Sequence, residues 1–372
     1  MSTTLRSVVE CHIVQTVPPA NLNRDDNGSP KEAYFGGYRR SRVSDAAWKR
    51  ATRMYFADEM GMEDAQLGIR TKRIAAQLAD RLVKRHAVEA AEAGRLATAL
   101  LAPLGITASS KKAEETSYLF FYGHRQLDAI ADLAAKAQGL GDKELEEYAK
   151  GAGVKQALSE KHPLDVALFG RMVANLSSIG VEGAVQVAHA LSTHAVELET
   201  DYLTAVDDAN EEDERGAGMI VRRPFNSATL YRYANVNVHQ LAKTLDGTQE
   251  AVDGVLRFVE AFAKSMPKGH ISSFAHRTVP QLIAVTHRTD QAVNLVTAFE
   301  SPVRPGADGI ASRSVQCLDD EHTSVTTQWA APPDWAGHTH MLGDQSLESF
   351  GERSAFPDLL AGLRRRLTEV HQ

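Results

Sequence analysis

Residues 22–53 read LNRDDNGSPKEAYFGGYRRSRVSDAAWKRATR, a polar loop with two adjacent glycines that leads into a helix. The stretch contains eight basic and four acidic residues, so its net charge is +4, whereas the whole chain of 372 residues carries −7. A basic region on an acidic protein is typical of a polyanion site, because phosphate contacts supply most nucleic-acid affinity. A solvated loop whose charges only promote solubility explains the composition equally well, so charge alone does not decide.

The loop is flanked by a predicted strand and a predicted helix. Residues 8–17, VVECHIVQTV, are apolar and β-branched, which predicts a buried strand that ends at the proline pair 18–19. Ser44 is a predicted helix N-cap, with Asp45 favourably placed in the first turn. A loop of this length between two regular elements is more often functional than idle.

The helix after Ser44 is expected to separate cations from apolar side chains. Successive residues turn by about 100°, which places Lys49, Arg50 and Arg53 on one face. The opposite face, expected to pack, carries Ala47, Trp48, Ala51, Met54 and Tyr55.

Beyond residue 60, apolar periodicity predicts a helical region followed by alternating strands and helices. Expected helices are 74–102, 113–138, 142–150, 248–266 and 356–370. Expected strands are 165–169, 184–196, 229–238 and 281–286, with a protruding hairpin or loop at 197–226 and a loop-rich region at 301–351. This order predicts an α+β domain of split-βαβ type, made of residues 1–60 and 162–372, with residues 61–161 as a helical insertion.

The composition bounds the class of protein. Hydrophobic residues make up 43% of the chain and charged residues 24%, which is ordinary for a globular protein with a real core. The two cysteines, Cys11 and Cys317, argue against a disulfide scaffold and fit a reducing compartment. Because the chain has no apolar run of signal-peptide or membrane-spanning length, we expect a cytoplasmic protein with no membrane partner.

Known catalytic and metal-binding patterns are missing from the sequence. His189 and His194 are five residues apart on a strand-like segment and point to opposite faces, and His338 and His340 lie in the loop-rich region. The sequence has no P-loop, dinucleotide fingerprint or nucleophile elbow. We therefore expect no metal site, no cofactor and no enzymatic activity.

Asp25 and Asp26 are the only candidates for a carboxylate pair in the basic loop. Neighbouring residues of an extended chain point apart, so the two do not form a dyad unaided. The expected role is local, either pairing with Arg24 or Lys31 or capping a turn.

Seven short motifs in a fixed order carry a resemblance to a known family. They are LNRDD at 22–26, FGGYRRSRVS at 35–44, KR at 49–50, GRM at 170–172, AHALSTH at 188–194, TAVDD at 204–208 and YRYANVN at 231–237. Together they resemble the CasC family, the backbone subunit of the type I-E CRISPR Cascade surveillance complex. The matched motifs span about residues 8–241, and the resemblance is only general from residue 281 onward.

The resemblance implies a right-hand fold, with an RRM-like palm, inserted helical fingers and a β-hairpin thumb at residues 200–226. Several copies would stack head to tail along a CRISPR RNA, together with the large, small, CasD-type and guide-processing Cascade subunits. Each thumb would flip one base at regular intervals and leave the rest of the spacer free to pair with target DNA. The subunit would be a scaffold in antiviral defence and not the nuclease.

The resemblance also assigns residues to the RNA. Predicted RNA contacts are Asn23, Arg24, Asp26, Lys31, Arg40, Arg42, Ser44, Lys49, Arg50, Arg53, Arg171 and Met172. Predicted wedge residues of the thumb are Tyr202, Leu203, Met219 and Ile220, and the residue that inserts stays open because some relatives have Trp-Phe where this chain has Tyr202-Leu203. The acidic run at 207–214 is unexpected on an RNA surface and is expected to meet a neighbouring subunit.

An enzyme is the alternative that the sequence leaves open. Related backbone subunits of type III complexes cleave target RNA with an acidic residue in a palm loop. Asp26 lies in the corresponding kind of loop, so a metal-dependent endoribonuclease is the second hypothesis.

Overall fold

The computed structural model describes residues 6–371 apart from 108–114, 117–118, 174–176 and 207–216, and it leaves the side chains of 204–221 undescribed. The chain folds as a mixed α/β protein that divides into two compact units. Unit 1 comprises residues 1–55, 186–236 and 255–372, and unit 2 comprises residues 56–185 and 237–254. In the described ranges, no helix combines the length and apolarity needed to cross a membrane.

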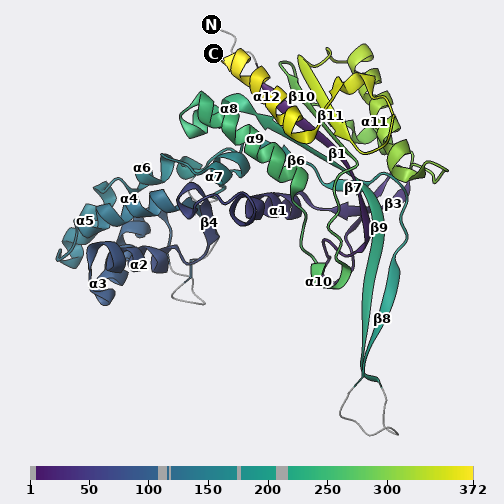
Figure 1. The fold of residues 1–372 in the computed structure, drawn as a ribbon. Coiled ribbons are helices and arrows are strands. Elements are labelled where there is room, and N and C mark those ends of the chain that lie inside the picture. The colour runs from purple at the N-terminus through teal and green to yellow at the C-terminus, as the bar shows by residue number, and fades with distance from the viewer. Residues whose placement is uncertain (1–5, 108–114, 117–118, 174–176, 207–216, 372) are drawn as a thin grey trace. The chain divides into compact units, whose positions relative to one another are not determined.

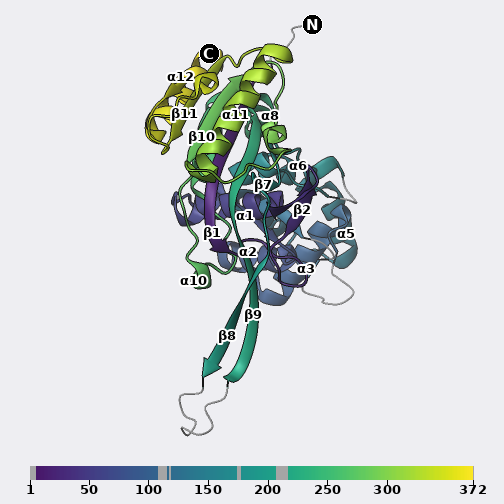
Figure 2. The same cartoon turned by 90° about the vertical axis from the view of Figure 1, so that its right-hand side faces the viewer.

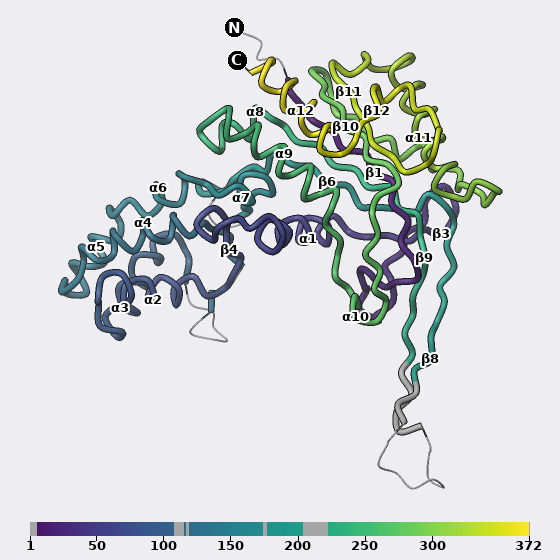
Figure 3. The backbone as a smooth tube through the Cα atoms, in the orientation of Figure 1, coloured from purple at the N-terminus to yellow at the C-terminus, as the bar shows by residue number. Residues whose placement is uncertain are grey.

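Unit 1 is built on a large, mostly antiparallel sheet (Figure 1). Its main path runs in the order β12-β11-β10-β1-β9-β7-β3-β2. The strands are β1 Val8–Ala20, β2 Glu32–Phe35, β3 Tyr38–Val43, β6 Val185–Val187, β7 Ala190–Ser192, β8 Glu199–Val206, β9 Ala217–Asn237, β10 Leu282–Arg288, β11 Trp335–His340 and β12 Glu352–Arg353. The first strand is central because its apolar residues are buried on both faces, with β10 antiparallel on one side from Val8↔Arg288 to Val14↔Leu282. Figure 3 traces β1 beside β10, although the two strands are far apart in the sequence.

Helices cover both faces of this sheet. They are α1 Asp45–Asp58, α9 Thr248–Lys264, α10 Ile271–Phe274, α11 Gly309–Gln328, α12 Phe356–His371, and the 3-10 helices η5 Leu295–Phe299 and η6 Glu348–Phe350. Successive side chains of β9 point to opposite faces of the sheet. Arg232 lies against Trp48 of α1 and Phe262 of α9 on one face. Tyr231 and Tyr233 belong to the apolar cluster with η5 and α11 on the other face. The sheet is therefore the middle layer of unit 1.

A two-stranded ribbon of β8 and β9 extends beyond the rest of the sheet (Figure 2). The strands pair antiparallel from Glu199↔Phe225 to Val206↔Ala217, with a register shift between Ala205 and Val206. The predicted hairpin at 197–226 is therefore present.

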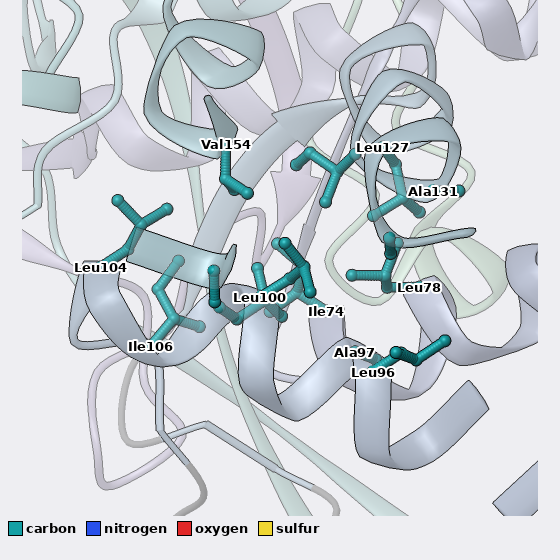
Figure 4. Close-up of a cluster of buried hydrophobic side chains, with 14 of the residues drawn as sticks. Ile74, Leu78, Leu96, Ala97, Leu100, Leu104, Ile106, Leu127, Ala131 and Val154 are labelled. Carbon is teal, nitrogen blue, oxygen red and sulfur yellow. The ribbon is translucent and has the colours of Figure 1, made fainter. Parts of the chain in front are cut away.

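Unit 2 is mainly helical. Its elements are η1 Asp64–Gln66, β4 Gly68–Thr71, α2 Ile74–His86, α3 Ala90–Leu101, η2 Ala102–Leu104, β5 Phe120–Gly123, α4 His124–Ala135, α5 Asp142–Gly151, α6 Val154–Ser159, α7 Leu164–Phe169, η3 Ser177–Ile179 and α8 Val238–Leu245. Leucines and alanines at helical spacing point inward from α2, α3 and α4 and form one buried core with Ile106 and Val154 (Figure 4).

Several predicted elements or element boundaries are wrong. Residues 165–169 form helix α7, not a strand, with Pro163 at its N-cap and Gly170 at its C-cap. The region 301–351 contains the long helix α11 as well as β11. The predicted helix 74–102 is two helices, since Ala87 adopts a left-handed conformation between them, and β5 occupies part of the predicted helix 113–138. The first strand also continues through the proline pair to Ala20.

Candidate nucleic-acid interface

The loop between β1 and β2 is held by its own polar side chains. Asn21 Nδ2 donates to the carbonyl oxygens of Gly28, at 2.9 Å, and Pro224, at 3.0 Å. Asp25 Oδ1 accepts from the backbone N–H groups of Asn27 and Ser29, both at 2.9 Å. Asp25 therefore closes a turn, which is one of the two local roles expected for it.

Asn23 joins the loop to the start of α1. Its Oδ1 accepts from the backbone N–H of Ser44 at 2.9 Å, and its carbonyl oxygen accepts from Lys31 N at 2.8 Å. Ser44 Oγ accepts from Ala47 N at 3.3 Å, which confirms Ser44 as the N-cap. These bonds fix the loop against the helix N-terminus.

A chain of alternating groups connects β3, β7 and α1. Arg42 Nη1 lies 3.3 Å from His189 Nδ1, His189 Nε2 lies 3.8 Å from Asp45 Oδ1, and Lys49 Nζ lies 3.0 Å from Asp45 Oδ2. Arginine only donates, so Nδ1 of His189 is assigned as the acceptor and its Nε2 carries the hydrogen that faces Asp45. The Asp45 carboxylate thus positions Lys49 directly and Arg42 through His189, and its single negative charge cannot neutralise both cations.

Asp45 is ionised over the whole neutral range. Burial alone would raise its pKa, but the hydrogen bond and charge of Lys49, with smaller help from the Ala46 N–H and His189, lower the pKa below its usual value. The cations of α1 therefore keep their acidic anchor at any pH near 7.

Helix α1 presents its cations largely as predicted. Arg50 is exposed, and Lys49 and Arg53 are half-buried. Trp48 is fully buried, as expected, whereas Met54 is 37% exposed and does not belong to the packed face where it was predicted.

Two arginines among the predicted contacts lie inside the protein, and the predicted contact Ser44 is buried as well. Arg40 is fully buried and donates to the carbonyl oxygens of Ser192, Phe299 and Glu300. Burial lowers its pKa. This geometry favours a structural role, and we leave Arg40 out of the proposed contacts.

Arg171, in unit 2, is in the same situation. It is 3% exposed and donates to the carbonyl oxygens of Ile179, Phe121 and Leu158, and burial lowers its pKa to about 10. Its neighbour Met172 is 91% exposed, an unusual position for a large apolar side chain. Of these two, only Met172 is available to a ligand.

The β8–β9 hairpin carries the predicted wedge residues. Tyr202 is 59% exposed and lies under the guanidinium of Arg222, 5.3 Å from ring centroid to carbon, and Leu203 is half-buried. The side chains of Met219 and Ile220 lie outside the described residues.

Arg24 and His270 form a second set of polar groups beside the loop between β1 and β2. Arg24 Nη1 lies 3.1 Å from His270 Nε2, beside an open hollow of about 480 Å³ lined by Asp25, Asp26 and Gly269, among others. Asp26 itself is exposed. In the described part of the chain, no group of three His, Cys, Asp or Glu side chains is placed to hold a metal ion.

Sequence reasoning missed His189 and His270. The first lies in the AHALSTH motif, where it was weighed only as a metal ligand. The second lies in a segment with no motif at all, so only the fold reveals it.

Comparisons with known proteins cover nearly the whole chain. The model of a family described as CT1975-like protein matches residues 9–361. A solved chain described as "CRISPR RNA-guided surveillance complex, pre-nicking" is 31% identical, with a TM-score of 0.83, and the match covers 97% of this chain and 100% of that chain. Another, described as "CRISPR RNA-guided surveillance complex", is 29% identical with a TM-score of 0.74, covering 96% and 99%. No curated protein sequence matches.

Proposed function

The chain belongs to the CT1975-like protein family, as a backbone-type subunit of CRISPR RNA-guided surveillance complexes, and on this premise we propose that its basic loop and α1 hold the phosphate backbone of a guide RNA. Spacers differ in sequence, so the guide has to be held through phosphate and sugar and not through its bases.

The observation that carries this proposal is the chain of groups from Arg42 through His189 and Asp45 to Lys49. It connects cations from a strand and a helix, and Arg50, next to Lys49 in the sequence, is exposed. Only one carboxylate takes part, so the surface keeps a positive charge for a polyanion. Nothing in the arrangement is a paired donor and acceptor of the kind that reads a base edge.

The decisive experiment removes two of these cations. We expect Lys49→Ala combined with Arg50→Ala to weaken binding of single-stranded RNA equally for unrelated sequences. The slope of log affinity against log salt falls by about 1.4 when two phosphate contacts are lost. The matched control is Arg257→Ala with Arg304→Ala, which removes two exposed charges elsewhere in unit 1. A loss confined to certain sequences would contradict backbone recognition.

The finer features belong to the same proposal. Residues 1–60 and 162–372 would form an RRM-like palm, residues 61–161 the fingers and residues 200–226 the thumb. Several copies would assemble head to tail on the guide, with the other Cascade subunits, as in type I-E complexes, and expose spacer segments to target DNA. The exposed Tyr202 and Met172 support contacts with bases.

The thumb has its own test. Replacing Leu203 and Ile220 with glycine is expected to spare assembly on RNA but to remove the regular pattern of unstacked nucleotides. Chemical probing of the bound guide measures this, and an unchanged reactivity pattern would refute the wedge.

The endoribonuclease stays the alternative. Asp26 is exposed in the hollow, but its neighbour Asp25 already accepts two backbone hydrogen bonds. Regularly spaced, metal-dependent RNA cleavage that Asp26→Ala abolishes would establish the enzyme and displace the scaffold.

A further inference from the structure

Three segments distant in sequence meet where the β8–β9 hairpin leaves the sheet. Arg24 comes from the loop after β1, Arg223 from β9, and His270 from the segment before α10. Arg24 Nη1 lies 3.1 Å from His270 Nε2, and Arg223 Nη1 donates to Ser273 Oγ at 2.9 Å. The three basic side chains therefore occupy one place.

This meeting point is tightly built. A Cβ on Gly269 would collide with the carbonyl oxygen of Leu22, so the backbones of the loop and of the α10 segment are in direct contact. Phe225 and Phe274 pack with ring centroids 6.0 Å apart. The basic groups are thus held by a rigid frame and not by a free loop.

The cluster has donors to spare. Across the described residues neither guanidinium is in an ion pair, and each makes one hydrogen bond out of five N–H groups. Because Arg24 donates to Nε2 of His270, the other ring nitrogen carries a hydrogen and is a further donor. His270 also has a φ of +51°, an uncommon conformation for a residue other than glycine, which is typical of functional positions.

Charge is the unusual feature of the cluster. Burial, followed by the positive charges of Arg24 and Arg223, lowers the pKa of His270 below its usual value. Among the described residues, the carboxylates that line the adjoining hollow are those of Asp25, whose Oδ1 is engaged in the turn, and Asp26. Two like charges brought together by a rigid frame favour an anion between them.

We propose that Arg24, Arg223 and His270 form one phosphate subsite that grips a single phosphodiester of the guide at the base of the hairpin. The inference rests on the proposed function and deepens it, since it adds RNA contacts from β9 and from the segment before α10 to those of the basic loop and α1. A site of pure donors suits a phosphate and rejects a base edge, which would also need acceptors.

The test combines variants with a modified RNA. Arg223→Gln keeps hydrogen bonding but removes charge, His270→Asn keeps hydrogen bonding but removes the group that can take up a proton, and Arg257→Gln is the matched control. Binding of labelled single-stranded RNA is measured by anisotropy, and thermal unfolding shows that each variant is folded. We expect affinity losses of about five- to tenfold for the two variants and none for the control.

A scan of the RNA locates the contact. Single methylphosphonate linkages, which are uncharged, are placed along the RNA. One position is expected to weaken binding to the wild-type protein and to have little further effect on Arg223→Gln, which is the coupling expected of a direct contact. Additive losses at every position would overturn the proposal.

The remaining outcomes are also decisive. If both variants bind RNA like Arg257→Gln but fail to assemble into larger particles, the cluster holds a neighbouring protein and the phosphate subsite is wrong, while the proposed function stands. If the wild-type protein binds no RNA, the proposed function fails, and this inference falls with it.

Discussion

The interior of the sheet and the surface of the loop use arginine in opposite ways. Arg232 is fully buried, lies 3.7 Å from the Trp48 ring centroid and donates to Gln15 Oε1 and the carbonyl oxygen of Phe262. Arg24, in contrast, is exposed and makes one hydrogen bond with a histidine in the described structure. Arg232 therefore stabilises the fold, whereas Arg24 is accessible to a ligand.

Burial between aromatic rings and acceptors, and not charge, separates the two roles, and within the guanidinium group of Arg232 only Nε is a buried nitrogen without an acceptor in the described structure. Burial lowers the pKa of Arg232 to about 9, so the group is still charged at neutral pH, yet aromatic faces and acceptors surround it. A buried cation in such a shell stabilises the fold, whereas an exposed cation with unused donors is available to a ligand.

The largest effect is expected from Arg232→Ala. It leaves a cavity beside Trp48 and an unpaired Gln15 oxygen, so the free energy of unfolding falls by about 3 kcal/mol. Urea denaturation measures the loss, with Arg257→Ala as the exposed control, expected to change stability by less than about 0.5 kcal/mol. RNA affinity of the folded variant stays the same, and a large affinity loss in a stable Arg232→Ala protein would contradict a purely structural role for Arg232.

A smaller effect is expected at the boundary between the two regions. Asn23→Ala leaves the half-hidden backbone N–H of Ser44 without its acceptor, which costs about 1 kcal/mol of stability. Asn23→Asp retains the acceptor and therefore the stability, but its negative charge lowers RNA affinity. If the aspartate variant unfolds as easily as the alanine variant, the hydrogen bond from Ser44 N to the Asn23 side chain does not contribute this stability.

The smallest effect is a pH dependence. An RNA phosphate raises the pKa of His270, which Arg24 and Arg223 lower in the free protein, so binding takes up a proton. The affinity of the wild-type protein therefore falls about threefold or more as pH rises from 6 to 8, and His270→Asn loses this dependence. His189→Asn tests whether the other histidine of the surface contributes, and a wild-type affinity that increases with pH would reverse the sign we derive.

The sequence predicted the local elements of the basic stretch because their signals are local. Ser44 and Asp45 mark a helix start, and the 3.6 period places Trp48 inside and Arg50 outside. The period misplaced Met54 because the helix packs through a narrow face of Trp48, Thr52 and Phe56.

Elements with ambiguous or polar patterns were not predictable. The run at 165–169 is too short for its hydrophobic pattern to distinguish a strand from a helix. Only the flanking Pro163 and Gly170 favour the helix that forms. Helix α11 was missed because its buried face mixes the polar residues Ser314, Asp319 and His322 with Val315 and Leu318, so its apolar periodicity is interrupted. Likewise Arg40 and Arg42 have the same local pattern, and only the tertiary fold buries one and leaves the other partly accessible.

The contact of Gly269 with the loop backbone has a consequence for synthesis of the chain. Residues 21–28 leave the ribosome long before Gly269, and β1 has no β10 beside it until residues 282–288 have been made. Such distant pairings form late, because the intervening chain must close first. The nascent chain thus exposes its arginines before the frame that orients them exists, so on the proposed function specific engagement of RNA would begin only after residues 269–288 have emerged.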